Sequence, residues 1–252
     1  LGVFDSGTGL DHSEFAGKNH RSIHLADRLA DGSSCTNTTM LSGPDACFSS
    51  DGNDVAIDMT LLDMDQANID NVNRQGLFEG LAYNTHGTHV SGTIAANRDG
   101  SGTHGVAFGA DLSVARLFFN SLTVWDVDPS TNQYRNGSVG IGASDEVFAD
   151  LYEQLNAQQV RAVNHSWGFT NEPTTADQQD ADFFNDPAYD DYFQIIGDGS
   201  RANGMIQVWA AGNSADYNPS PEQAPLAGVY ATLPRAFADI EPYWLAVVNL
   251  DQ

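Results

Sequence analysis

Basic residues are scarce in this chain. Its 252 residues include one lysine, Lys18, and only 10 Lys and Arg against 34 Asp and Glu, which gives a formal net charge of −24. Such a surface repels nucleic acid phosphates and anionic lipid headgroups, so nucleic acid and membrane surfaces are excluded as partners. Because salt screens self-repulsion of this size, the composition suits either a salty habitat or the solubility of a secreted protein.

Long apolar runs are also missing. No stretch of about 18 apolar residues occurs, so we expect no segment to span a membrane. The first residues, Leu1–Phe4, are typical of a core strand and not of a signal peptide, so we expect targeting segments to have been removed or left out. The 41% apolar residues and 24 glycines indicate a globular, loop-rich protein. Its length suits one large α/β domain, or at most two small ones.

Cysteine occurs twice, at Cys35 and Cys47, on either side of a short polar loop. A zinc site would need a second Cys or His pair nearby, and the sequence has none there. The spacing favours a local disulfide bond, which would indicate an oxidising compartment outside the cytoplasm. Two free thiols are the alternative interpretation.

Apolar, β-branched runs without polar alternation predict buried strands of a parallel sheet. We expect strands at Leu1–Phe4, Leu112–Leu117, Val160–Asn164, Met205–Ala210 and Leu245–Leu250, and helices at Val90–Asn97, Asp145–Gln158 and Tyr192–Asn203. This alternation predicts an α/β fold with a doubly wound, mostly parallel sheet and helices on both faces. Ligands gather at the carboxyl ends of the strands in such sheets, where Asp5 and Ala211–Asn213 follow predicted strands.

Two polar stretches interrupt this pattern. We interpret Ser33–Asn73 and Asn171–Asp191 as insertions in a single domain that spans residues 1–252. The first contains Asp63-Met64-Asp65, which has part of the pattern of a calcium loop but lacks the glycine and the terminal glutamate of an EF-hand. A structural calcium ion and a solvated acidic loop both stay open as interpretations.

Two residues are candidates for acid–base chemistry. Asp5 ends an apolar strand, and His86 opens a segment of small residues typical of a closely packed helix. A buried carboxylate can fix the tautomer of a histidine, which then acts as a general base, although Asp-Ser-Gly alone is also an ordinary strand-to-turn junction. His86 and His89 could form a metal pair, but the glutamate of the zincin motif and a third ligand are missing, so we predict no metal site.

Three motifs occur in an order that carries more information than each alone. Asp5-Ser6-Gly7, then His86-Gly87-Thr88-His89-Val90-Ser91-Gly92-Thr93, then Ala210-Ala211-Gly212-Asn213 resemble the subtilisin-like serine proteases. The resemblance runs from Leu1 to Leu250, apart from the two insertions. Finer features, among them Leu233-Pro234-Arg235, are similar to the protease passenger domains of bacterial autotransporters.

The resemblance implies roles for individual residues. Asp5 would orient His86, His86 would be the general base, and the side-chain amide of Asn213 would donate to the oxyanion of the tetrahedral intermediate. Ser166, Trp167 and Gly168 would pair with an extended substrate backbone, and Trp167 would wall a subsite, unless it is a plain core aromatic. Ala210, Ala211 and Gly212 would form one side of the specificity pocket. This chemistry requires no cofactor.

The nucleophile of that family is missing. Its Gly-Thr-Ser segment does not occur here, nor does a Gly-x-Ser-x-Gly elbow, and Ser6, Ser91, Ser166 and Ser214 occupy other motifs. We therefore expect an internal piece of a longer protease, truncated before the nucleophile segment and inactive alone. The whole would be a secreted or cell-surface serine endopeptidase that acts on peptides or proteins, with the remaining C-terminal part as partner of this chain. A pseudoprotease or binding module on the same scaffold is the alternative.

Overall fold

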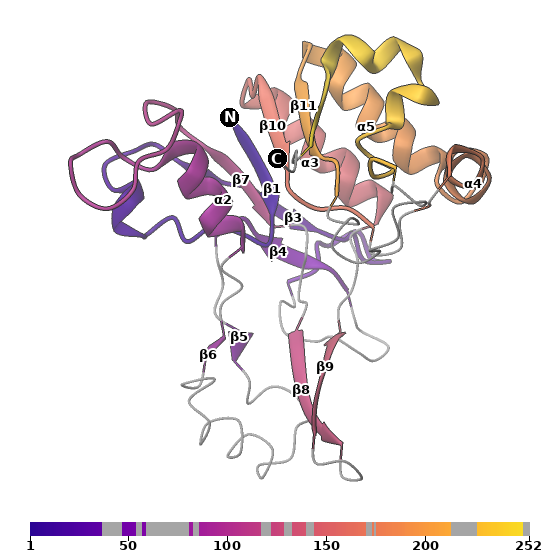
Figure 1. Cartoon of the computed structure of the whole chain (residues 1–252). Helices are drawn as coiled ribbons and strands as arrows, with labels where there is room; N and C mark the ends of the chain where they lie inside the picture. Colours follow the sequence, from indigo (N-terminus) through magenta and orange to yellow (C-terminus); the bar gives the residue numbers. More distant parts are fainter. Residues whose placement is uncertain are drawn as a thin grey trace.

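The computed structural model describes residues 1–36, 47–53, 86–116, 144–169, 173, 175–212 and 226–248, and also gives the strands at 57–58, 81–82, 122–128 and 133–139. A central sheet of six parallel strands has the order β12-β11-β10-β1-β7-β2 (Figure 1). Its strands are β1 (Gly2–Asp5), β2 (Arg21–Ser22), β7 (Ser113–Arg116), β10 (Ala162–His165), β11 (Ile206–Ala210) and β12 (Trp244–Val247).

Helices lie on both faces of this sheet. α2 (His86–Ala95) packs on one side, and α3 (Asp145–Ala157) and α5 (Asp190–Asn203) lie on the other (Figure 1). The smaller helical elements are η1 (Ser13–Phe15), α4 (Ala176–Gln179), the π-helical turn η3 (Asp180–Phe184), η4 (Leu233–Arg235) and η5 (Ala238–Tyr243). Three antiparallel pairs complete the described structure: β3–β4 (His24–Ala26 and Ser49–Asp51), β5–β6 (Ile57–Asp58 and Leu81–Ala82) and β8–β9 (Leu122–Asp128 and Gln133–Val139).

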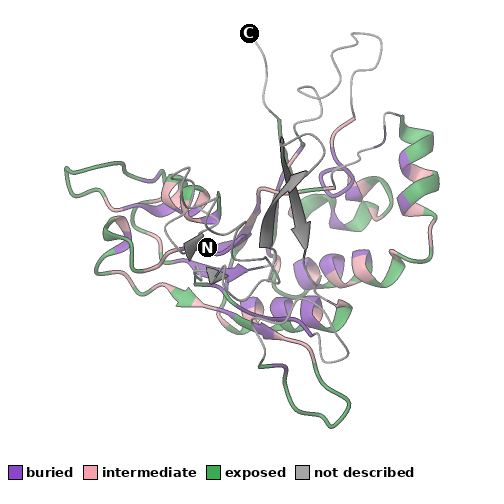
Figure 2. Cartoon of the chain, turned by 90° about the horizontal axis from the view of Figure 1, so that it is seen from below, coloured by how far each residue is buried: buried purple, intermediate pink, exposed green. Residues whose placement is uncertain are grey.

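Alternate residues of β1 and β7 enter two separate hydrophobic cores. Val3 of β1 and Val114 of β7 pack under α2 together with Ala95 and Leu112. Phe4, one residue further along β1, belongs to the larger core beneath α3 and α5. Because both faces are covered at this point, all residues of β1 and β7 are buried, as Figure 2 shows for the centre of the molecule.

The sequence of α3 explains its ends and its orientation. Ser144 caps the helix by accepting from the Val147 backbone N–H, and Asp145 and Glu146 place negative charge in the first turn. One stripe of the helix is buried, made of Val147, Phe148, Leu151, Tyr152 and Leu155. α5 packs tightly against this helix, since a Cβ on its Gly199 would lie 2.3 Å from the Tyr152 ring.

The predicted fold is confirmed. Every predicted strand of the central sheet is present, and each helix is found close to its expected range. The largest difference is α2, which begins at His86 rather than Val90. Its first turn contains Gly87 and Thr88, both poor helix formers, so the local sequence does not indicate that the helix begins before Val90. The two insertions stay a prediction; residues 37–46, 54–56 and 59–73 of the first lie outside the described residues.

Candidate active site

Asp5 lies at the carboxyl end of β1, between β10 and β7, where the strand order of the sheet reverses direction. Its carboxylate is 1% exposed. Oδ1 accepts from the Ser6 backbone N–H at 2.7 Å and contacts Nδ1 of His86 at 2.6 Å. Such a switch point is where α/β sheets of this type bind ligands.

His86 is the first residue of α2, and its side chain is 57% exposed. A carboxylate can only accept, so the short contact with Asp5 places the proton of the neutral ring on Nδ1. Nε2 then has the lone pair that a general base uses. The structure thus brings together the two residues that the sequence marked for acid–base chemistry, although the 80 residues between them give no local signal of this contact.

The turn after β1 is tied closely to the first turn of α2. The Gly87 N–H donates to Ser6 Oγ at 3.0 Å, and the Gly9 N–H donates to Thr88 Oγ1 at 2.8 Å. Gly7 has a positive φ of 99°, which favours glycine in the turn. These contacts were not predicted from the sequence, in which Ser6 and Thr88 were noted only as members of two motifs.

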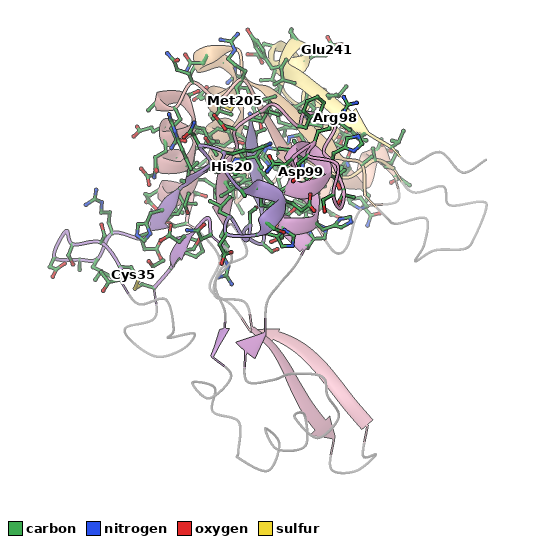
Figure 3. The ribbon with its side chains drawn as sticks, turned by 90° about the vertical axis from the view of Figure 1, so that its left-hand side faces the viewer. His20, Cys35, Arg98, Asp99, Met205 and Glu241 are labelled. Atoms are coloured by element: carbon green, nitrogen blue, oxygen red, sulfur yellow. A yellow bond between two sulfur atoms is a disulfide. The ribbon has the colours of Figure 1, made fainter. Side chains whose placement is uncertain are left out.

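Lys18 holds the other end of the same helix. Its ammonium donates to the carbonyl of Ala95, the last residue of α2, and to that of Phe108 at 2.8 Å. A cation is favourable at a helix C-terminus, where carbonyls lack partners within the helix. Arg98 and Asp99 follow at the surface (Figure 3), and the Arg98 guanidinium lies 5.3 Å from the centre of the Phe108 ring.

The predicted substrate strand leaves the sheet beside Asp5. Ser166 and Gly168 follow β10 directly, and the Asn164 side-chain amide donates to Ser166 Oγ at 2.9 Å. Trp167 is half-buried against an aromatic group, with ring centres 5.0 Å from both Trp209 and Tyr230. It therefore has one packed face and some exposed surface, which fits either a subsite wall or a core aromatic.

The predicted pocket segment follows β11 at the same edge of the sheet. The Ala211 N–H donates to the Val247 carbonyl, and the Ala211 carbonyl accepts from the Gly228 N–H, each at 2.8 Å. Gly212 has a φ of 100°, which a side chain would disfavour. Asn213, the predicted oxyanion donor, lies outside the described residues.

A buried histidine lies beneath this edge. His165 is 1% exposed and stacks on Trp209 at 3.8 Å between ring centres, and its Nε2 contacts Gln207 Oε1 at 2.7 Å. Burial lowers the pKa of His165 to about 3, so the ring is neutral in the folded protein. Since Gln207 Oε1 accepts, Nε2 is the protonated nitrogen.

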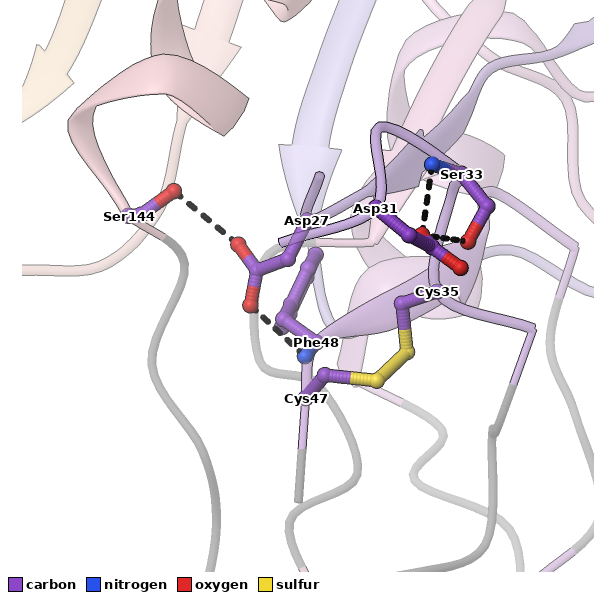
Figure 4. The surroundings of a disulfide bond; sticks show 7 residues. All are labelled: Asp27, Asp31, Ser33, Cys35, Cys47, Phe48 and Ser144. Carbon is purple, nitrogen blue, oxygen red and sulfur yellow. Dashed lines mark hydrogen bonds between the residues drawn. A yellow bond between two sulfur atoms is a disulfide. The ribbon is translucent and has the colours of Figure 1, made fainter. Parts of the chain in front are cut away.

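The predicted disulfide bond joins Cys35 and Cys47 (Figure 4). Next to it, the Asp27 carboxylate accepts from the Phe48 backbone N–H at 2.8 Å and from Ser144 Oγ at 2.9 Å. Because Ser144 also caps α3, Asp27 connects the disulfide loop to the start of that helix. No group of three or more metal-binding side chains gathers within the described part of the chain. Among those residues, no helix is long and apolar enough to cross a membrane.

Comparison with known proteins gives the family. The sequence matches the model of the Subtilase family over residues 1–252. An extracellular serine protease of Serratia marcescens is 28% identical over 195 residues, which cover 68% of this chain and 16% of that protein. Fervidolysin of Fervidobacterium pennivorans is 38% identical over 84 residues, which cover 33% of this chain and 10% of that protein.

The chain therefore aligns with only a small part of the length of these relatives, at most 16%. The match of the whole sequence to one family agrees with the parallel sheet. This chain belongs to the subtilase family.

Proposed function

We propose that this chain supplies the acid–base part of an extracellular serine endopeptidase with an Asp-His-Ser triad. Asp5 orients His86, and His86 takes the proton of a serine hydroxyl and later gives it to the leaving amine. The observation that carries the proposal is the 2.6 Å contact between a buried carboxylate and Nδ1 of a ring that is 57% exposed. A histidine with a purely structural role would have little reason to face solvent while a buried charge holds it.

We assign the oxyanion and substrate-binding roles to segments that follow strands at the same edge of the sheet as Asp5. Asn213 directly follows the exposed Gly212 and would donate its amide to the oxyanion. The segment 166–168 continues from β10, next to β1, and would pair with an extended peptide. Ala210–Gly212 would form one side of the specificity pocket, where small side chains leave room.

The attacking serine would come from a segment beyond residue 252. Three serines near the motifs have hydroxyls engaged within the fold: Ser6 with the Gly87 N–H, Ser91 with Thr8 and Ser166 with Asn164. None of these hydroxyls contacts His86 within the described hydrogen bonds. The chain alone would then be inactive towards peptides.

Exposed apolar side chains on β12 support a further segment of the same protease as partner. The register places Val3, Asn164, Val208 and Leu245 in one row across the sheet, and α2 covers this face at Val3. At the other end of the row, Leu245 is 52% exposed, and Val247, two residues further along β12, is 51% exposed. Apolar side chains on a central sheet normally pack against another layer, so a covering segment fits here.

Secretion is supported by the disulfide bond, which suits an oxidising compartment, and by the description of the Serratia relative as extracellular. The narrower likeness to autotransporter passenger domains stays a prediction. So does a structural calcium ion at Asp63 and Asp65, which lie outside the described residues. No cofactor is needed for the proposed chemistry.

A fluorophosphonate probe on the full protein tests the proposal, because only an activated serine reacts with it. We expect one labelled serine outside these 252 residues, with labelling abolished in His86→Ala. His89→Ala is the matched control, since this histidine is exposed and lies one turn further along α2. Absence of labelling in the wild-type protein would refute the protease and favour a pseudoprotease or binding module on the same scaffold.

A further inference from the structure

Two buried hydroxyl groups join the turn after β1 to α2. Thr8 Oγ1 lies 2.7 Å from Ser91 Oγ, and both residues are 0% exposed. Thr8 is three residues after Asp5, and Ser91 is five residues after His86. The hydroxyl pair is therefore shielded from solvent and connects the same two segments as the Asp5–His86 contact.

Thr8 is fixed from the opposite side as well. Its backbone N–H donates to the Gly52 carbonyl at 2.9 Å, and the Gly52 N–H donates to the Ile23 carbonyl at 2.9 Å. A Cβ on Gly52 would lie 1.9 Å from the Val114 carbonyl oxygen, so this segment is pressed against β7. Thr8 is thus held in place by the central sheet, whereas Ser91 moves with α2. The bond between them therefore depends on where α2 lies relative to the sheet.

A hydroxyl pair fixes this position more sharply than an apolar pair would. Methyl groups pack acceptably over a range of small shifts, whereas a buried hydroxyl that loses its partner is unfavourable. Sliding or rotating α2 would separate Thr8 from Ser91 and leave both without this bond. The His86 ring is 57% exposed, so its placement depends on the position of the helix that carries it.

We propose that Thr8 and Ser91 are positioning residues that set the His86 ring against the Asp5 carboxylate. This inference rests on the proposed function, in which His86 is the general base. Thr8 and Ser91 act only through the helix and touch neither substrate nor the reacting atoms.

The test compares Thr8→Val, Ser91→Ala and the double variant with the wild type in the full protein. In the double variant we expect kcat for a fluorogenic peptide to fall by about 10- to 100-fold, the size of effect that a small misplacement of a catalytic group produces, with KM unchanged. The low-field proton NMR signal of His86 Nδ1–H should weaken or move upfield. Thr8→Ser keeps the hydroxyl and should retain the wild-type signal and rate.

Thr93→Ala is the control on the same helix, because Thr93 is exposed and its hydroxyl donates to the His89 carbonyl, one turn before it. It should leave both readouts unchanged. If the double variant does not fold, Ser91→Ala decides, since alanine is a good helix former.

Unchanged kcat and an unchanged proton signal in folded Ser91→Ala and double variants would overturn the positioning role, even if thermal stability fell. The proton signal is independent of turnover. If the wild-type protein shows no peptidase activity, the proposed function fails, while the effect of Thr8 and Ser91 on the Asp5–His86 contact is still measured.

Discussion

Gly87 approaches the carbonyl of Gly7 so closely that a Cβ atom on residue 87 would lie 2.1 Å from that oxygen. No side chain fits there without moving either the turn after β1 or the start of α2. The two segments carry Asp5 and His86, so their separation is set at this contact by the absence of a side chain.

Gly87→Ala should therefore impair both stability and catalysis. Overpacking of this kind costs typically about 1–3 kcal/mol of unfolding free energy. Displacing His86 by about 1 Å should lower kcat on the order of 10²-fold. Urea unfolding and peptide hydrolysis by the full protein measure the two effects.

Gly92→Ala is the matched control. Gly92 lies in the interior of the same helix, and apart from its chain neighbours and the nearby helix backbone no described atom lies within 4 Å of its would-be Cβ. Here alanine should leave kcat unchanged and raise helix stability by up to about 1 kcal/mol. Equal losses in both variants would show that helix composition, and not the contact with Gly7, determines the result.

Asp5→Asn should leave the fold intact and remove most activity. The amide can still accept from the Ser6 N–H, but its NH₂ group would donate to His86 Nδ1 and favour the wrong tautomer. We expect kcat to fall by about 10⁴-fold, the typical effect of this change in an Asp-His-Ser triad, with little change in KM.

Asp11→Asn removes the same charge from an exposed residue six positions further on and should keep wild-type activity. A rate for Asp5→Asn within a factor of about two of the wild type would be incompatible with Asp5 as the residue that orients the base.

Replacing both cysteines by serine should destabilise the fold. Cys35 and Cys47 are separated by 12 positions, and closing a loop of that length stabilises by about 3 kcal/mol in the chain-entropy description. The midpoint of urea unfolding should fall in the double variant and in the reduced wild type alike. A reductant should have no effect on the double variant, which separates loss of the bond from other effects of reduction.

Much of this fold could be predicted from the sequence because its signals are local. Continuous apolar runs marked every strand of the central sheet except the short, polar β2, and the short spacing of Cys35 and Cys47 marked the disulfide bond. Asp5 and His86 were found because each lies in a motif of adjacent residues. Local patterns identify such features without knowledge of what packs against them.

Contacts across the chain could not be predicted in the same way. The Thr8–Ser91 pair spans 83 positions, and each residue alone fits an ordinary turn or helix. The close approach of Gly87 to Gly7 depends on how α2 lies on the sheet. His165 likewise gave no sign of its burial, because its stacking partner Trp209 comes from a different strand.

His165 should make stability depend on pH in a known direction. An unfolded histidine has a pKa of about 6.5, whereas burial lowers the pKa of His165 in the folded protein to about 3. Above about pH 6.5 the ring is neutral in both states and contributes no pH dependence. As the pH falls from there towards about 3, His165 becomes protonated in the unfolded chain but stays neutral in the folded protein. The free energy of unfolding therefore falls by on the order of 1 kcal/mol per pH unit.

His165→Gln removes this titration while its amide can still donate to Gln207. Urea unfolding of both proteins between about pH 4 and pH 8 gives the comparison. The difference in unfolding free energy between wild type and variant should be constant above about pH 7, where His165 is neutral in both states. Below that it should shift steadily in favour of the variant, because only the wild type has a buried imidazole to keep unprotonated. Curves that stay parallel down to pH 4 would mean that the folded protein accommodates the protonated ring, which is inconsistent with its burial against Trp209.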